Sequence, residues 1–210
     1  MEYNSIKCNK VSMPIVGLTL MLVAGNAWCQ LNDTIFPTLN TDWSCHDSNA
    51  NETEYCKTDN RDVTVFIQSS IDWTPGGGAW NIWSNLLDEY DPTDLNIIWD
   101  GTPKYSGSGE TDIIYQQSNS VPSGLLGLAY CEDAQTSTKC DQHYVLFATD
   151  TPGTDLACHE SGHAVGLTHG ANSWFSTSNS DTRLGCMRTP IVTGSDSIGA
   201  IHRAHINREY

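Results

Sequence analysis

The chain has 210 residues and a formal net charge of −15, from 25 acidic and 10 basic side chains. A surface of this sign repels phosphate backbones and anionic lipid headgroups, which argues against nucleic acid and membrane surfaces as partners. The length is enough for one domain with its own hydrophobic core and too short for two large ones, and we expect a monomer.

Residues 1–27 are typical of a secretory signal. Lys7 and Lys10 precede an apolar run over 13–25, which is shorter than the roughly 18 residues that a membrane-spanning helix needs. Small residues, the last of them Ala27, stand where cleavage is expected. We therefore expect a secreted, extracellular protein with no helix inserted in a membrane.

The cysteines that follow the expected signal agree with export, because most cysteines pair in an oxidising compartment. Their spacing suggests two short disulfide loops, Cys45–Cys56 and Cys131–Cys140. The odd number of cysteines leaves one unpaired, most simply Cys29. Spacing alone does not fix the pairing.

Residues 28–60 are polar and follow no clear period, so we expect an irregular N-terminal segment that could serve as a short pro-segment. From residue 61 the pattern changes between the two-residue period of strands and the apolar stripe of a helix. The predicted elements, in chain order, are a strand over 62–70, a helix over 79–90, strands over 95–101, 111–117, 125–133 and 143–150, and a second helix over 155–167. This order points to a mixed α/β domain with one backing helix.

The densest run of potential metal ligands is "CHESGHAVGLTHG" (158–170), on and after the second predicted helix. His159 and His163 lie four residues apart, so their imidazoles project from one face of a helix and can reach one ion. Gly166 can adopt a left-handed conformation that ends the helix, and the returning chain then brings His169 to the same ion. Three neutral imidazoles leave a fourth position for water, which is the pattern of a catalytic Zn²⁺ site.

Two further residues of this run favour a metal site over the alternative, a helix whose histidines only pack or face water. Glu160 is offset around the helix, where its carboxylate can act on a water at the metal but is poorly placed as a third ligand. Gly162 costs about 1 kcal/mol relative to alanine inside a helix. That cost is easier to explain if another group must approach the helix closely there.

Five positions of the run spell H-E-x-x-H-x-x-G-x-x-H, which resembles the zinc-binding signature of the metzincin proteases. The segment "GCMRTP" (185–190) is similar to the Met-turn of that clan and offers Met187. The stretches "LLGLAYCED…CDQHYVLF" and "HRAHIN" look like those of small secreted matrixins of bacteria. The resemblance extends over about residues 60–207.

The resemblance implies a metzincin-like zincin catalytic domain over 61–210. Its α/β (α+β) fold would have a mixed five-stranded sheet, a backing helix, an active-site helix and a small C-terminal subdomain with the Met-turn. It also implies one catalytic Zn²⁺ on His159, His163 and His169, with Glu160 as the general base.

A disulfide between Cys158 and Cys186 is expected within this resemblance, because these cysteines directly precede the first ligand and Met187. The alternative is that Cys158 is simply buried. The loops over 91–112 could bind Ca²⁺, as matrixins often do, although no complete ligand set is readable there.

Relatives of this kind bind substrate as an extra strand at the edge of the sheet. The expected docking residues are Gly127, Leu128, Ala129 and Tyr130. An alternative stays open here, since Gly124 and Gly127 could do no more than shape a turn and a bulge. The segment over 188–195 should form the pocket for the residue that follows the scissile bond.

These observations predict a secreted zinc endopeptidase that acts on protein or peptide substrates. One rival is a non-catalytic, zinc-containing protein that binds peptides or a partner. The intact Glu160 counts against it, because loss of that residue is the simplest route to an inactive enzyme. Another rival is a disulfide-linked structural protein without metal, which tight stoichiometric zinc would exclude.

Overall fold

The computed structural model describes residues 33–38, 43–50 and 55–210. The chain divides into a unit over 1–31 and a second unit over 32–210, and the described residues belong to the second. The expected signal over 1–27 and Cys29 lie outside the described residues.

The described residues form six strands, three α-helices and three short helical turns. In chain order these are β1 (Lys57–Thr58), β2 (Asp62–Ile67), α1 (Gly78–Asn85), η1 (Leu86–Tyr90), β3 (Asn96–Trp99), β4 (Ile113–Gln117), β5 (Gly127–Thr136), β6 (Lys139–Phe147), α2 (Thr154–Ala164), η2 (Gly170–Asn172), η3 (Thr182–Met187) and α3 (Gly199–Glu209). The turn η1 is a π turn that continues α1, and η2 and η3 are 3₁₀ turns.

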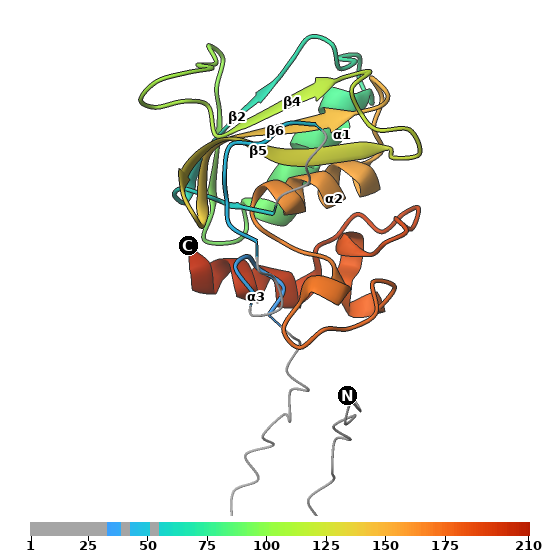
Figure 1. The fold of residues 1–210 in the computed structure, drawn as a ribbon. Coiled ribbons are helices and arrows are strands. Elements are labelled where there is room, and N and C mark those ends of the chain that lie inside the picture. The colour runs from blue at the N-terminus through green and yellow to red at the C-terminus, as the bar shows by residue number, and fades with distance from the viewer. Residues whose placement is uncertain (1–32, 39–42, 51–54) are drawn as a thin grey trace, which may run out of the picture. The chain divides into compact units, whose positions relative to one another are not determined.

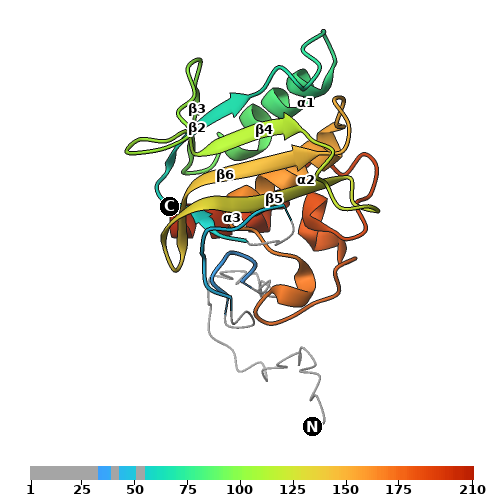
Figure 2. The same ribbon diagram turned by 45° about the horizontal axis from the view of Figure 1, so that its top comes forward.

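All six strands belong to one mostly parallel sheet. The order is β1-β6-β4-β2-β3, and β5 pairs with β6 as the antiparallel member. Figure 2 looks onto this sheet and shows β3 toward one edge and β5 toward the other. In both views α1 and α2 lie against the same face of the sheet (Figures 1 and 2). The molecule is therefore the mixed α/β domain that the sequence predicts.

The prediction of five strands was wrong, because β1 adds a sixth. It has two residues and pairs in parallel with the start of β6, with Lys57 opposite Lys139. A strand this short cannot show the alternation from which strands are predicted. The segment before residue 61 also contributes Ile35, which is 1 % exposed and packs in the main hydrophobic core. Parts of the N-terminal segment are thus built into the fold.

The predicted helix over 79–90 forms α1 and η1, and most of its apolar stripe is buried, although Leu87 is 40 % exposed. Ile82, Leu86 and Tyr90 are completely buried in the main hydrophobic core. The Tyr90 hydroxyl donates to the carbonyl oxygen of Cys158 at 2.5 Å. The backing helix therefore supports α2 both by packing and by a direct hydrogen bond.

Beyond α2 the chain forms a smaller part from η2, η3 and α3, shown in orange and red in Figure 1. Thr34 joins it to the N-terminal segment, with its Oγ1 at 2.8 Å from Nδ1 of both His202 and His205. Nε2 of His202 donates to the carbonyl of Leu184 at 3.0 Å, and burial lowers the pKa of His202 to about 4. These two histidines pack inside the fold.

The described residues contain three disulfides, and these are pairs that the sequence suggests. Cys45 is bonded to Cys56, Cys131 to Cys140, and Cys158 to Cys186. Disulfides of this number fit an oxidising, extracellular environment. Over the described ranges, no helix combines the length and the apolar character needed to cross a membrane.

Candidate metal centre

The helix α2 carries two of the three expected ligands. The helix begins after Gly153, which has an extended conformation and provides no side-chain cap. At the other end Gly166 has a φ of 89°, so the left-handed turn predicted there is confirmed. This turn brings His169 back toward the helix.

The three histidines meet at their Nε2 atoms. Nε2 of His163 lies 3.1 Å from that of His159 and 3.2 Å from that of His169, and the remaining pair is 3.1 Å apart. In a tetrahedral site with Zn–N distances of about 2.0–2.1 Å, two ligand nitrogens are separated by about 3.3–3.4 Å. The triangle of nitrogens therefore has nearly the size that a zinc ion requires.

The second ring nitrogen of two ligands faces a main-chain carbonyl. Nδ1 of His159 lies 2.7 Å from the oxygen of Cys186, and Nδ1 of His163 lies 2.8 Å from the oxygen of Leu167. A carbonyl only accepts hydrogen bonds, so each Nδ1 carries the proton and donates it. The Nε2 lone pairs are then free for a cation, as in known metal-binding histidines.

Burial also favours the uncharged form of these imidazoles, which is the form that binds metal. It lowers the pKa of His159, and together with the neighbouring imidazoles it lowers the pKa of His163 well below the usual value. The same two causes lower the pKa of His169 to about 4. The donor set thus fits one divalent cation of the zinc type.

Glu160 lies in the same cavity, where burial raises the pKa of its carboxyl group to about 8. A cation beside the carboxylate opposes this effect of burial and favours the ionised form. The carboxylate rests against Gly127 in β5: a Cβ at that position would lie 2.8 Å from both Cγ and Oε1 of Glu160. The absent side chain of Gly127 therefore makes room for Glu160, whereas Gly124 has a φ of 94° and forms a turn in open space.

Met187 packs beneath α2 at Gly162. A Cβ on Gly162 would overlap Sδ of Met187 and would lie 3.2 Å from the hydroxyl of Tyr90. The close approach expected at Gly162 is therefore real, and the group that approaches is Met187. The Cys158–Cys186 disulfide joins the same two segments.

A cavity of about 420 Å³ opens in front of the three histidines and Glu160. Residues 124–129 form one wall, residues 189–191 form another, and Tyr55 closes the space beside the histidines. Gly127, Leu128 and Ala129 thus lie at the site, as does part of the segment expected over 188–195. Tyr130 lies further along β5 and stacks on Tyr144, with ring centroids 5.8 Å apart.

The N-terminal segment covers the outer edge of β5 beyond Tyr130. The amide of Ser48 donates to the carbonyl of Cys131 at 2.9 Å, and the Ser48 hydroxyl donates to the same oxygen at 2.7 Å. The amide of Cys45 donates to the carbonyl of Ser137 at 2.9 Å. A peptide that paired with this edge of β5 would therefore meet the N-terminal segment at Cys131. Only the part of β5 before Cys131 could pair with it.

Sequence reasoning missed Tyr55. Its ring stacks on the imidazole of His163 with centroids 4.4 Å apart, and its hydroxyl lies 3.4 Å from Nδ1 of His169. The only sequence signal is its position directly before Cys56, and nothing in the spacing relates residue 55 to the histidines.

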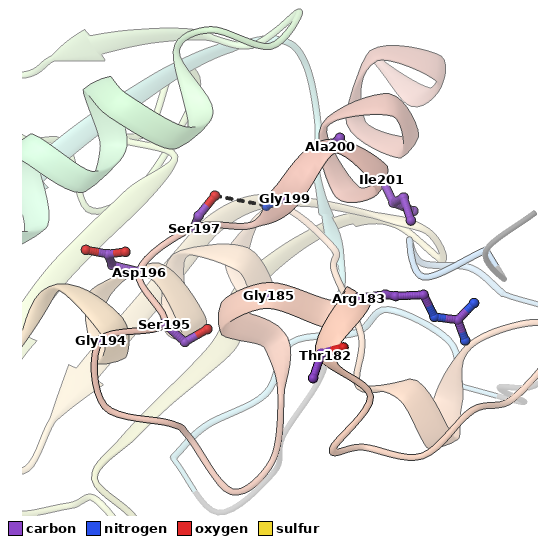
Figure 3. Close-up of a pocket in the computed structure, with 10 residues that line it drawn as sticks. All are labelled: Thr182, Arg183, Gly185, Gly194, Ser195, Asp196, Ser197, Gly199, Ala200 and Ile201. Atoms are coloured by element: carbon purple, nitrogen blue, oxygen red, sulfur yellow. Dashed lines mark hydrogen bonds between the residues drawn. The ribbon is translucent and has the colours of Figure 1, made fainter. Parts of the chain in front are cut away.

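A second cavity, of about 430 Å³, lies between η3, the loop over 194–197 and the start of α3 (Figure 3). The Ser197 hydroxyl is engaged within the protein: it donates to Glu89 at 2.8 Å and accepts from the amide of Gly199 at 3.1 Å. Arg183 pairs with Asp181 and extends away from the serines of the loop (Figure 3). Of the predicted site residues it contains only Gly194 and Ser195, at the end of the segment expected over 188–195.

One other group of potential ligands converges among the described residues, the sulfurs of Cys45, Cys56 and Cys131. All three belong to disulfides and cannot act as thiolate ligands. The loops over 91–112, where Ca²⁺ was considered, contribute to neither group.

Comparison of the sequence with models of known protein families and with curated proteins found no match. The functional proposal therefore rests on the residues of the site.

Proposed function

We propose that the protein is a secreted zinc-dependent endopeptidase of the metzincin type, similar to the matrixins. The observation that carries the proposal is the triangle of Nε2 atoms of His159, His163 and His169, in a cavity that also contains Glu160. Three imidazoles and no oxygen ligand suit Zn²⁺ better than Ca²⁺ or Mg²⁺. Met187 beneath α2 supports the metzincin type, and the three disulfides support secretion.

When bound, Zn²⁺ supplies a Lewis acid that polarises a carbonyl group and activates water near neutral pH. The protein's own base is Glu160, whose carboxylate takes the proton of the attacking water and later releases it to the nitrogen of the leaving amine. Gly127 leaves the room that this carboxylate occupies, because any larger residue would displace it.

The substrate is a peptide in an extended conformation, which adds to the free edge of β5 through main-chain hydrogen bonds. Such pairing is independent of sequence, so selectivity comes from the cavity walls. These walls include Leu125, Leu126 and Ile191, and the two leucines are 46 % and 62 % exposed. We expect a preference for an apolar side chain next to the scissile bond.

The test compares the chain from residue 28 onward with Glu160→Gln on unfolded casein, with and without a zinc chelator. Cleavage by the parent should stop with chelator and return with zinc, and Glu160→Gln should cleave about 10²–10⁴-fold more slowly while still binding zinc. Glu110→Gln is the matched control, since Glu110 is also buried, at 7 % exposure, but lies outside the cavity. Tight zinc binding without cleavage by the parent would favour the non-catalytic binding protein, and absence of zinc binding would contradict both.

A further inference from the structure

The hydroxyl of Tyr55 is the hydrogen-bond partner of the third ligand, in the place that main-chain carbonyls take for the other two. Nδ1 of His159 and Nδ1 of His163 donate to carbonyl oxygens, whereas the partner of Nδ1 in His169 is the hydroxyl of Tyr55, at 3.4 Å. His169 lies after the turn at Gly166, outside α2, so the helix does not fix its orientation. Of the three ligands, His169 depends most on a side-chain partner.

The ring of Tyr55 also restrains His163. The two rings are stacked, with centroids 4.4 Å apart and an angle of 29° between their planes. The ring of His169 meets Tyr55 edge to face, at 5.7 Å and 68°. One side chain thus contacts two of the three ligands.

Tyr55 is itself held by a small core that is separate from the main one. Its buried members are Phe36, Cys45, Tyr55, Cys56, Cys131 and Cys140. Two disulfides lie in this cluster, and Sγ of Cys45 is 3.7 Å from Sγ of Cys131. The carbonyl of Cys56 accepts from Nε2 of His143 in β6 at 3.2 Å, which fixes the backbone next to Tyr55 on the sheet.

We propose that Tyr55 is a positioning residue of the metal centre, held against the ligands by the disulfide-bonded core of the N-terminal segment. The hydroxyl accepts the Nδ1 proton of His169, and the ring fixes the plane of His163, so that both Nε2 atoms stay directed at one ion. Partners of this kind typically change metal affinity or activity by about 10–100-fold when they are removed. The inference rests on the proposed function only in requiring that the site binds metal.

The experiment measures metal binding, not hydrolysis. Zinc affinity is determined by competition with a chromophoric chelator for the parent, Tyr55→Phe and Tyr55→Leu, and the visible spectrum of each Co²⁺-substituted protein reports the ligand geometry. Tyr144→Phe is the control, because Tyr144 is a partly buried, stacked tyrosine of β6 that does not line the cavity. We expect about 10-fold weaker zinc binding for Tyr55→Phe, up to about 100-fold for Tyr55→Leu, and a changed Co²⁺ spectrum in both.

A purely structural role of Tyr55 would lower the unfolding midpoint without changing affinity or spectrum. If both variants bind zinc as tightly as the parent and give the same Co²⁺ spectrum, the inference is overturned. If Tyr55→Leu fails to fold, Tyr55→Phe decides, because it keeps the ring and removes only the hydroxyl. A parent that binds no zinc overturns the proposed function itself, an outcome distinct from equal binding by parent and variants.

Discussion

Replacing Gly162 by alanine raises the helix propensity of α2 but crowds the side chains packed beneath it. In an exposed helix interior this change stabilises a protein by about 1 kcal/mol. Here the new Cβ would overlap Sδ of Met187 and would lie 3.0 Å from Cε of Met187 and 3.2 Å from Oη of Tyr90. Carbon atoms in ordinary contact are about 3.5–4.0 Å apart, so the groups beneath α2 must move.

The expected loss of stability depends on how little Met187 and Tyr90 can move. Met187 and Tyr90 are both fully buried, and the Cys158–Cys186 disulfide ties the segment before Met187 to α2. Overpacking of a buried site costs about 1–3 kcal/mol, and a contact this short belongs in the upper part of that range. After subtraction of the helix gain, Gly162→Ala should lower the free energy of unfolding by about 1–2 kcal/mol.

Denaturant unfolding of a double-mutant cycle measures this value. In a Met187→Ala background the overlap is gone, so Gly162→Ala should be neutral or stabilising by up to about 1 kcal/mol. Gly101→Ala is the control, because a Cβ there meets only Nε1 of Trp99, at 3.7 Å, and should change stability little. Stabilisation by Gly162→Ala in the parent, or the same effect in both backgrounds, would refute the packing of Met187 against α2.

Three further outcomes follow from the same structure. Gly127→Ala should displace the Glu160 carboxylate and slow peptide hydrolysis at least about 10²-fold, while zinc titration still shows one bound ion; loss of the ion would mean that Gly127 shapes the whole site. Burial lowers the pKa of His202 from 6.5 to about 4, so the unfolded chain binds more protons between these values. His202 should then contribute about 3 kcal/mol to the fall in the free energy of unfolding as the pH drops through that window, and urea titrations should show a smaller fall for His202→Gln. A chain that begins at residue 61 lacks Ile35 and β1 and should not unfold cooperatively in a thermal melt; a melt like the parent's would identify a dispensable pro-segment.

The parts of the site that could be predicted lie close together in the sequence. Helix geometry alone places His159 and His163 on one face, and the left-handed turn at Gly166 determines where His169 returns. For these ligands the local chain already determines the geometry. Spacing also suggests the two short disulfide loops, since a loop of few residues brings its ends together at little entropic cost, but it does not fix the pairing.

The parts that could not be predicted depend on contacts between distant segments. Tyr55 reaches His163 only because the N-terminal segment runs along the sheet, and two-residue β1 leaves no periodic signal of that path. The sequence allowed two interpretations of Gly127, as part of a docking strand or as a bulge. Neither included its actual contact, the carboxylate of Glu160, because that contact exists only once β5 and α2 are packed together.

The groups that orient the three ligands come from distant parts of the chain, although the ligands themselves lie within eleven consecutive residues. Their Nδ1 partners are Cys186 in η3, Leu167 in the turn after α2 and Tyr55 in the N-terminal segment. Disulfides hold two of these three partners, directly at Cys186 and through Cys56 for Tyr55. The disulfides therefore contribute to the candidate metal centre without supplying a ligand, because they fix the groups that determine which nitrogen of His159 and of His169 is free to bind.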